Sequence, residues 1–388
     1  MHVQFLSAAQ VRDIDGNLSD LKKMLQDIQK KCKNALYLEV RAHIPLAHWP
    51  AYQACGFACG VSEQEQITVY AWPGLRQHWQ KTGTLALPVF EPVPVQKVTL
   101  PTCQQAIQVL RLDVLHPLLM GNKWFKLQHN LQAMADRGLR ELLTFGGAYS
   151  NHVYATAAAG QLLGIPTRAI IRGEPVQNPV LDAARANGLQ CTFWSRSDYR
   201  QKDQAYAELR ARYPEAWLVP EGGHNPEGIQ GTEAIWQHMP ALPKAASGPW
   251  TVFTACGTGS TLAGLIRACP DPDLRLHGVA VLKGGDFLKH DIQAVLSESA
   301  GGPLPTWQVH TAFHGGGYAR CNAELRAFLQ AFARCNPQVP VEPVYTGKLF
   351  WAIEQLLLQQ QLHPPILALH TGGVYAAPQD HDMLGSNA

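Results

Sequence analysis

Short apolar runs alternate with glycine-rich turns and helical patterns from about residue 85 to the end of the chain. This alternation is typical of parallel sheets whose strands are joined by helices that cover them. The predicted fold class is therefore α/β. Ligand sites in such sheets collect at the carboxyl ends of the strands, so the turns after the strands are the candidate binding sites. The runs predicted as strands are 141–145, 167–171, 191–194, 250–255, 276–282 and 364–370.

Composition excludes several classes of protein. With 46% hydrophobic and 16% charged residues, the chain is predicted to be globular. The 32 basic and 30 acidic residues give a net charge of +2, which indicates no nucleic acid partner. The amino terminus lacks a signal-peptide pattern and no apolar run is long enough to span a bilayer, so we expect no membrane association and a cytoplasmic location. The nine cysteines form no CxxC pair, so neither disulfides nor a metal site are predicted.

Residues 1–84 are predicted to form a separate small α/β extension of unknown role. Leu21, Met24, Leu25 and Ile28 share one face of a predicted helix, and the runs 35–40 and 67–72 are predicted strands. A connector rich in proline, residues 85–101, follows this extension.

The turn after the run 250–255 has the composition of a phosphate-binding loop. Its glycines let the backbone approach a ligand closely, its hydroxyls add donors, and it precedes a predicted helix whose amino-terminal dipole favours an anion. It is not a Walker loop, and it lacks the third glycine of the dinucleotide fingerprint. A plain strand-to-helix connection is the alternative interpretation. The residues concerned are Gly257, Thr258, Gly259, Ser260 and Thr261.

The turn after the run 141–145 offers three polar groups at a predicted helix start. Ser150 is a favourable N-cap for the alanine-rich helix that follows. Ser150, Asn151 and His152 together present a hydroxyl, an amide and an imidazole, a set that suits an anionic planar ligand. Capping alone is the simpler alternative.

The stretch GNKWFKLQHN places Lys123 directly after Gly121 and Asn122, at a predicted helix start. A lysine opposes the helix dipole there, so a solvated surface position is one explanation and a chemical role is another. Helical spacing puts Lys123, Lys126 and Asn130 on one face; it puts Trp124, Leu127, Leu131 and Met134 in the core. A lysine, an anion site and ring-binding polar groups are what pyridoxal phosphate requires.

Nine motifs in order give the chain a resemblance to a known family: GNKWFKL, FGGAYSNH, IIRGE, SRSDYR, PEGGHN, CGTGSTLAGL, LKGGDFL, EPVYTGK and HTGG. The chain resembles the D-cysteine desulfhydrase and 1-aminocyclopropane-1-carboxylate (ACC) deaminase family, pyridoxal phosphate enzymes of fold type II, over roughly residues 85–380. The resemblance implies two three-layer αβα domains with the cofactor between them, and a homodimer. Residues 85–125 and 236–388 would form the large domain, and residues 126–235 the small inserted one.

The resemblance also implies roles for individual residues. Lys123 would bind the cofactor covalently, and Asn151 would bond its phenolic oxygen. Thr346 would face the pyridine nitrogen. Ser150 would be catalytic, and it would contact the amino-acid substrate together with His152 and Thr371. The phosphate would lie on Gly257, Thr258, Gly259, Ser260 and Thr261, and the two active-site tyrosines would be Tyr318 and Tyr345.

The reaction depends on positions at which the family divides. His152, Thr346 and Thr371 match the desulfhydrase side, where ACC deaminases carry Gln, Glu and Leu. A neutral hydroxyl beside the ring nitrogen gives a weaker electron sink than a carboxylate. We therefore expect α,β-elimination of D-cysteine or a related β-substituted amino acid to pyruvate, ammonia and hydrogen sulfide. ACC deamination to 2-oxobutyrate and ammonia is the alternative, and a nucleotide-binding module without catalysis is a third hypothesis.

Three residues depart from the family motif around the lysine. Met120 replaces a glycine, and Trp124 and Phe125 follow Lys123. Their bulk is expected to alter the pocket, so the natural substrate could be a β-substituted amino acid other than D-cysteine.

Overall fold

The structure is a computed structural model of the 388-residue chain. It describes residues 85–88, 90, 92–116, 118–243, 248–298 and 303–373, and the backbone of four short strands nearer the amino terminus. The chain divides into two compact units. The first comprises Met1–Val89, Pro117–Leu119 and Asn130–Glu221, and the second Phe90–His116, Met120–His129 and Gly222–Ala388.

The second unit is built on a six-stranded sheet with the order β13-β12-β11-β14-β6-β5. All neighbouring pairs are parallel except β5 and β6, which pair antiparallel at one edge. The central strand β11 is buried along its whole length, as expected for a strand covered on both faces. The strands are β5 (Val95–Thr99), β6 (Ala106–Leu110), β11 (Thr251–Cys256), β12 (Arg275–Ala280), β13 (Thr306–His310) and β14 (Ile366–Leu369).

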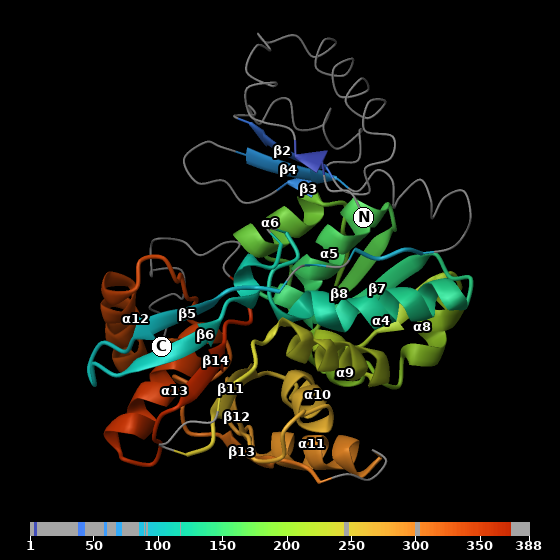
Figure 1. The fold of residues 1–388 in the computed structure, drawn as a ribbon. Helices are drawn as coiled ribbons and strands as arrows, with labels where there is room; N and C mark the ends of the chain where they lie inside the picture. Colours follow the sequence, from blue (N-terminus) through green and yellow to red (C-terminus); the bar gives the residue numbers. More distant parts are fainter. Residues whose placement is uncertain are drawn as a thin grey trace. The chain divides into compact units, whose positions relative to one another are not determined.

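Helices cover both faces of this sheet, which makes the second unit a three-layer αβα structure (Figure 1). The helices α12 (Ala323–Cys335) and α13 (Thr346–Leu358) pack together on one face, and their apolar side chains form one core with those of the sheet. The other face carries α10 (Ser260–Arg267), which also packs against α9 (Pro226–Glu233) and α11 (Phe287–Ser297). The short 3-10 helices of this unit are η3 (Leu112–Val114) and η5 (Ala234–His238).

The first unit contains a parallel four-stranded sheet with the order β10-β7-β8-β9. Its helix α5 (Asn151–Leu163) contacts β7 and β8 and is buried at every position but one. Tyr199 and Leu209, from two further helices, pack on sheet residues that include Phe145. The strands are β7 (Glu141–Gly147), β8 (Thr167–Arg172), β9 (Gln190–Trp194) and β10 (Ala216–Val219), and the other helices are α6 (Pro179–Ala186), α7 (Arg196–Arg200) and α8 (Tyr206–Arg212).

Two elements cross the division between the units. Helix α4 (Asn122–Asp136) begins in the second unit and ends in the first. The 3-10 helix η4 (Glu221–Gly223) does the reverse.

The backbone near the amino terminus contains a separate small sheet with the order β1-β2-β4-β3. The central pair, β2 and β4, is antiparallel and corresponds to the two predicted strands, although β2 begins three residues later than the run 35–40. The predicted helix around Leu21 lies outside the described residues. The strands are β1 (Gln4–Phe5), β2 (Leu38–Ala42), β3 (Ala58–Cys59) and β4 (Ile67–Ala71).

All six apolar runs predicted as strands are strands, so the α/β fold class is confirmed. The prediction of a plain connector at 85–101 was wrong in its second half, because Val95–Thr99 forms β5. Pro94 stands just before this strand, where proline interrupts no ladder. The predicted domain limits at 126 and 235 enclose the inserted segment Asn130–Glu221 of the first unit, and their assignment as domains stays a prediction.

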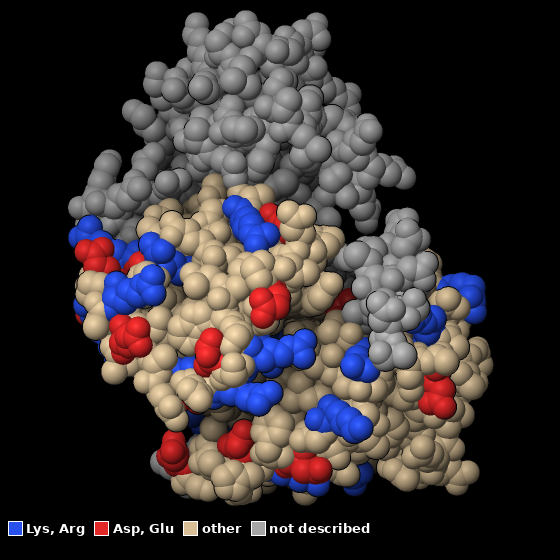
Figure 2. All heavy atoms as spheres, turned by 180° about the vertical axis from the view of Figure 1, so that it is seen from behind, with Lys and Arg blue, Asp and Glu red and all other residues tan. Residues whose placement is uncertain are grey.

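Charge is mixed on the face shown in Figure 2, where basic and acidic side chains of the described residues are interspersed. Among the described residues, no helix combines the length and the apolar character needed to cross a bilayer.

Candidate active site

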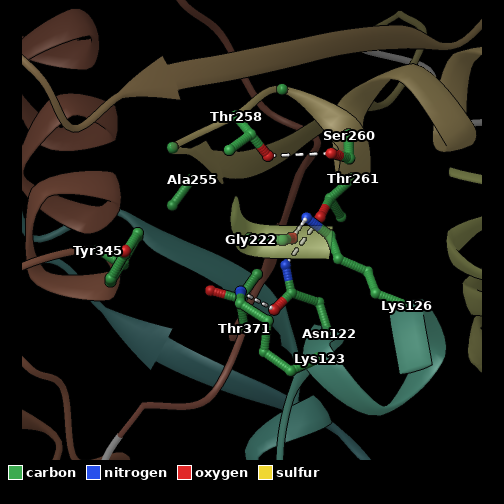
Figure 3. Close-up of a pocket in the computed structure, with 12 residues that line it drawn as sticks. Asn122, Lys123, Lys126, Gly222, Ala255, Thr258, Ser260, Thr261, Tyr345 and Thr371 are labelled. Atoms are coloured by element: carbon green, nitrogen blue, oxygen red, sulfur yellow. Dashed lines mark hydrogen bonds between the residues drawn. The ribbon is translucent and has the colours of Figure 1, made fainter. Parts of the chain in front are cut away.

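A cavity in the second unit lies where β11 and β14 end and where α4 and α10 begin (Figure 3). It contains about 400 Å³ of space between atoms, part of which is open to solvent. Its position at the carboxyl ends of parallel strands is the one expected for ligand sites of α/β sheets. The residues lining it are Asn122, Lys123, Lys126, Gly222, Ala255, Gly257, Thr258, Gly259, Ser260, Thr261, Tyr345 and Thr371.

The lysine predicted to react, Lys123, lines this cavity from the first turn of α4. Its Nζ donates a hydrogen bond to Oδ1 of Asn122 at 2.7 Å and lies 5.7 Å from the centre of the Tyr345 ring. Burial lowers the pKa of Lys123 to about 8, although the charge of Glu342 acts in the opposite direction. About a tenth of this amine is therefore neutral, and nucleophilic, at pH 7, far more than of an ordinary lysine.

The residues before Lys123 fix where its helix begins. Gly121 has a φ of +76°, and a Cβ there would lie 1.9 Å from the carbonyl oxygen of Thr371. That carbonyl accepts the backbone N–H of Asn122 at 3.3 Å. The Asn122 side chain donates to Oγ1 of Thr261 at 2.8 Å, so the lysine-bearing turn is tied to the glycine-rich loop.

The predicted phosphate-binding loop joins β11 to α10 at the cavity wall. Gly259 precedes α10 with a φ of +76°, a conformation that favours glycine. The hydroxyls of Thr258 and Ser260 lie 2.9 Å apart, and Nδ1 of His224 lies 2.8 Å from the Ser260 hydroxyl. Backbone N–H groups at a helix start, supported by hydroxyls, are well suited to bind a phosphate. His224 was not predicted as part of this site.

Lys126 brings a second amine to the same cavity. Its side chain is buried, and its Nζ donates to the carbonyl oxygen of Gly222 at 2.8 Å. Burial and the nearby charge of Lys123 hold the pKa of Lys126 well below its usual range. A surface role for this lysine is thereby excluded. The available sequence signal was its spacing of three residues from Lys123, which places both on one helical face.

The two predicted tyrosines lie together. The hydroxyl of Tyr345, a residue that lines the cavity, donates to that of Tyr318 at 3.3 Å, with the rings nearly perpendicular at 76°. Both rings are partly buried and also pack against the core of the second unit. The structure therefore combines the packing role and the polar arrangement that the sequence left as alternatives.

Thr346 begins α13, is fully buried, and is not among the residues that line the cavity. Its hydroxyl bonds to Glu342, a buried carboxylate that we did not predict. An acidic residue shortly before a helix start was the sequence signal for it. That Thr346 faces a ring nitrogen stays a prediction.

Ser150, Asn151 and His152 belong to the first unit, whereas the cavity belongs to the second. Ser150 is the N-cap of α5, as predicted, and its side chain accepts the backbone N–H of Val153. All three predicted side chains are buried. Their contact with cofactor and substrate stays a prediction.

The aromatic residues after Lys123 do not line the cavity, so the expectation that they reshape it is not supported. Trp124 packs edge-on against Phe90, and Phe125 packs edge-on against His238. Trp124, Leu127, Leu131 and Met134 all have 0% exposure, which confirms the predicted core face of α4. The helix turns the two aromatic rings away from the side that bears the lysine.

A lysine of lowered pKa beside an anion-binding loop, at the carboxyl edge of a parallel sheet, defines an α/β enzyme that holds an anionic carbonyl cofactor next to an amine. Residues 91–372 match the family of pyridoxal-phosphate dependent enzymes. The chain belongs to this family, and the predicted cofactor is confirmed. The residues present fit pyridoxal phosphate, because Lys123 offers the amine, the loop after β11 offers a phosphate site, and Lys126 adds a second amine in the same cavity.

Relatives carry both names that the sequence resemblance suggested. The chain is 26% identical over 269 residues to a putative ACC deaminase of Pyrococcus horikoshii, an alignment covering 66% of this chain and 80% of the relative. It is 28% identical over 298 residues to a D-cysteine desulfhydrase of Yersinia pestis, an alignment covering 70% of this chain and 87% of the relative. The solved structure of an ACC deaminase homologue covers 80% of this chain and 98% of its own, with a TM-score of 0.67 and 22% identity, which confirms the fold.

Proposed function

We propose that the protein is a lyase that eliminates the β-substituent of D-cysteine or of a related amino acid. With cysteine and water as reactants, the products are pyruvate, ammonia and hydrogen sulfide. The observation that carries the proposal is that an amine of lowered pKa and a tyrosine line one cavity. Lys123 has a pKa of about 8, and its Nζ lies over the ring of Tyr345.

When bound, pyridoxal phosphate supplies a ring that withdraws electrons from Cα of an attached amino acid. With the cofactor bound, Lys123 would accept the Cα proton of the substrate at Nζ, a task suited to a base whose pKa is near the working pH. Lys126 and the loop Gly257–Thr261 hold the phosphate and thereby fix where Cα lies.

Tyr345 is proposed to act on the leaving group. Its hydroxyl donates a hydrogen bond to that of Tyr318, so the hydroxyl of either tyrosine can pass a proton to the departing sulfur. By resemblance to the family, Ser150, His152 and Thr371 are proposed to hold the substrate carboxylate, and Asn151 the phenolic oxygen. Thr371 supports this as a residue of the cavity wall.

ACC deamination is retained as a second candidate because of one observation. A buried carboxylate, Glu342, lies 3.1 Å from the Thr346 hydroxyl, so an acidic group stands behind the residue proposed to face the ring nitrogen, as a strong electron sink requires. Under this alternative, ACC and water would give 2-oxobutyrate and ammonia. Binding without catalysis, the third hypothesis, is set aside because the family is one of enzymes.

Products separate the two reactions. Purified protein loaded with cofactor should be incubated with D- and L-cysteine, D- and L-serine, β-chloro-D-alanine and ACC. Elimination predicts pyruvate, with sulfide from cysteine, and no 2-oxobutyrate from ACC. Formation of 2-oxobutyrate alone would refute the proposed reaction in favour of the second candidate. A homodimer and a cytoplasmic location remain predictions from the sequence.

A further inference from the structure

Glu342 is buried immediately before α13 and its carboxylate is surrounded by donors. It accepts the backbone N–H groups of Val344 at 2.6 Å, Tyr345 at 2.9 Å and Thr346 at 2.7 Å. Burial raises the pKa of Glu342, and these hydrogen bonds act against the rise. Bonds of this kind favour the ionised carboxylate.

Two amines also act on this carboxylate. The charge of Glu342 raises the pKa values of Lys123 and Lys348, each of which burial lowers to about 8. Lys348 is fully buried, and its Nζ donates to the carbonyl oxygens of Gly317 at 2.7 Å and Val281 at 3.1 Å. By reciprocity, positive charge on either amine favours the ionised form of Glu342.

The hydroxyl of Thr346 has a fixed set of partners. It accepts the backbone N–H of Glu342 at 3.0 Å, and it lies 3.1 Å from the carboxylate oxygen Oε1. A hydroxyl has one proton and two lone pairs. When the carboxylate is ionised, the proton points to Oε1, because this charged acceptor is nearer than the carbonyl oxygen of Glu342, which lies 3.5 Å away. The single lone pair left can only accept a hydrogen bond.

We propose that Glu342 acts through the Thr346 hydroxyl and keeps the nitrogen that faces this hydroxyl protonated. This rests on the proposed function, in which that nitrogen belongs to the pyridine ring of the cofactor. Glu342 is then a positioning residue: it orients the hydroxyl as an acceptor and does not touch the cofactor. The pair Glu342–Thr346 would perform the task of a carboxylate at the ring, whereas an isolated threonine would favour an unprotonated nitrogen.

The wild-type protein tests this directly. The holoenzyme should be loaded with pyridoxal phosphate carrying ¹⁵N in the ring, and its ¹⁵N chemical shift followed by NMR from about pH 6 to about pH 9. We expect the shift of a protonated ring nitrogen at neutral pH. An unprotonated ring nitrogen at neutral pH overturns the proposal. Failure to bind the cofactor at all would instead overturn the proposed function.

A variant tests the link to Glu342. Glu342→Gln keeps an oxygen that can accept the backbone N–H groups but removes the charge, so the pH at which half of the ring nitrogen is protonated should fall by about one unit or more. Glu354→Gln is the matched control. Glu354 is also buried and lies within α13, but it accepts hydrogen bonds from Thr102 and none from Thr346. It should leave the ¹⁵N shift unchanged.

The outcomes are distinguishable. An unchanged ¹⁵N midpoint in Glu342→Gln, with Thr346→Val altering it, overturns the role of Glu342 and leaves Thr346 at the ring. No change in either variant overturns the placement of Thr346. If Glu342→Gln does not fold, the wild-type titration still decides whether the ring nitrogen is protonated.

Discussion

The hydroxyl oxygens of Tyr345 and Tyr318 lie 3.3 Å apart, and the first of these residues faces the cavity that contains Lys123. One hydroxyl therefore orients the other. Tyr345→Phe should reduce kcat/KM for D-cysteine by about 10²-fold or more, since general acid catalysis contributes at least that much. Tyr318→Phe should cost less, because it leaves the cavity-facing hydroxyl in place. Steady-state kinetics would measure both.

Tyr213→Phe offers a control for this pair, since Tyr213 stacks on Arg168 within the first unit. Its kinetics should match those of the wild type. Equal losses from Tyr318→Phe and Tyr345→Phe would mean that the two hydroxyls act as one group.

Lys123, and not Lys126, should carry the cofactor. Lys123 follows Gly121 and Asn122 directly, whereas the Nζ of Lys126 is held by the Gly222 carbonyl. Borohydride reduction followed by peptide mass mapping should place the pyridoxyl group on Lys123. Lys126→Met should still be labelled, with weaker cofactor binding through loss of an amine that can donate to the phosphate. A pyridoxyl group on Lys126 would refute the assignment.

Cofactor capture should depend on pH through Lys123. Only the neutral amine attacks the aldehyde, and burial lowers the Lys123 pKa from 10.5 to about 8. The rate at which cofactor-free protein gains visible absorbance should therefore rise with pH and level off above a midpoint near 8. A midpoint close to that of an ordinary lysine would show that the amine is not desolvated.

Gly121 should be intolerant of substitution. Gly121→Ala combines a φ of +76° with a Cβ placed 1.9 Å from the Thr371 carbonyl oxygen. We expect the free energy of unfolding to fall by about 2 kcal/mol or more, measured by denaturant titration. Gly138→Ala is the control, because Gly138 has a similar φ of +68° with no atom near the added Cβ. Its loss should be about 1 kcal/mol, from backbone strain alone. Equal losses would mean that the close approach is relieved without cost.

The segment before residue 85 should be dispensable for chemistry. Removing residues 1–84 leaves all of the family match at 91–372 and every residue of the cavity. The truncated protein should bind pyridoxal phosphate and retain elimination activity, as followed by absorbance and pyruvate formation. A soluble, folded product that binds no cofactor would show that this segment belongs to the active domain.

Much of the fold was predictable because buried parallel strands leave continuous apolar runs, as in β11 and β14. The glycine-rich loop and the position of Lys123 were predictable for a similar reason, since the local sequence decides where a helix begins. Strand β5 was missed because prolines surround it and its pairing partner, β6, decides its conformation.

The missed polar residues had a different cause. Lys126 becomes buried only when its helix packs, and a sequence gives no measure of that burial. Glu342 acquires its meaning from the Thr346 hydroxyl, a contact that residue type alone does not reveal. The sequence therefore indicated an isolated neutral hydroxyl at Thr346, whereas the structure places the carboxylate of Glu342 beside that hydroxyl.

Gly121 and Gly372 bring two backbone segments together at the edge of the cavity, where a Cβ on Gly372 would lie 3.0 Å from the Cα of Gly121. Neither position can vary in side chain without moving a segment that sets the lysine. Selection or design for a new substrate therefore cannot use these two positions. Libraries aimed at substrate range would be better directed at Thr371, which lines the same cavity and has a side chain that can be exchanged.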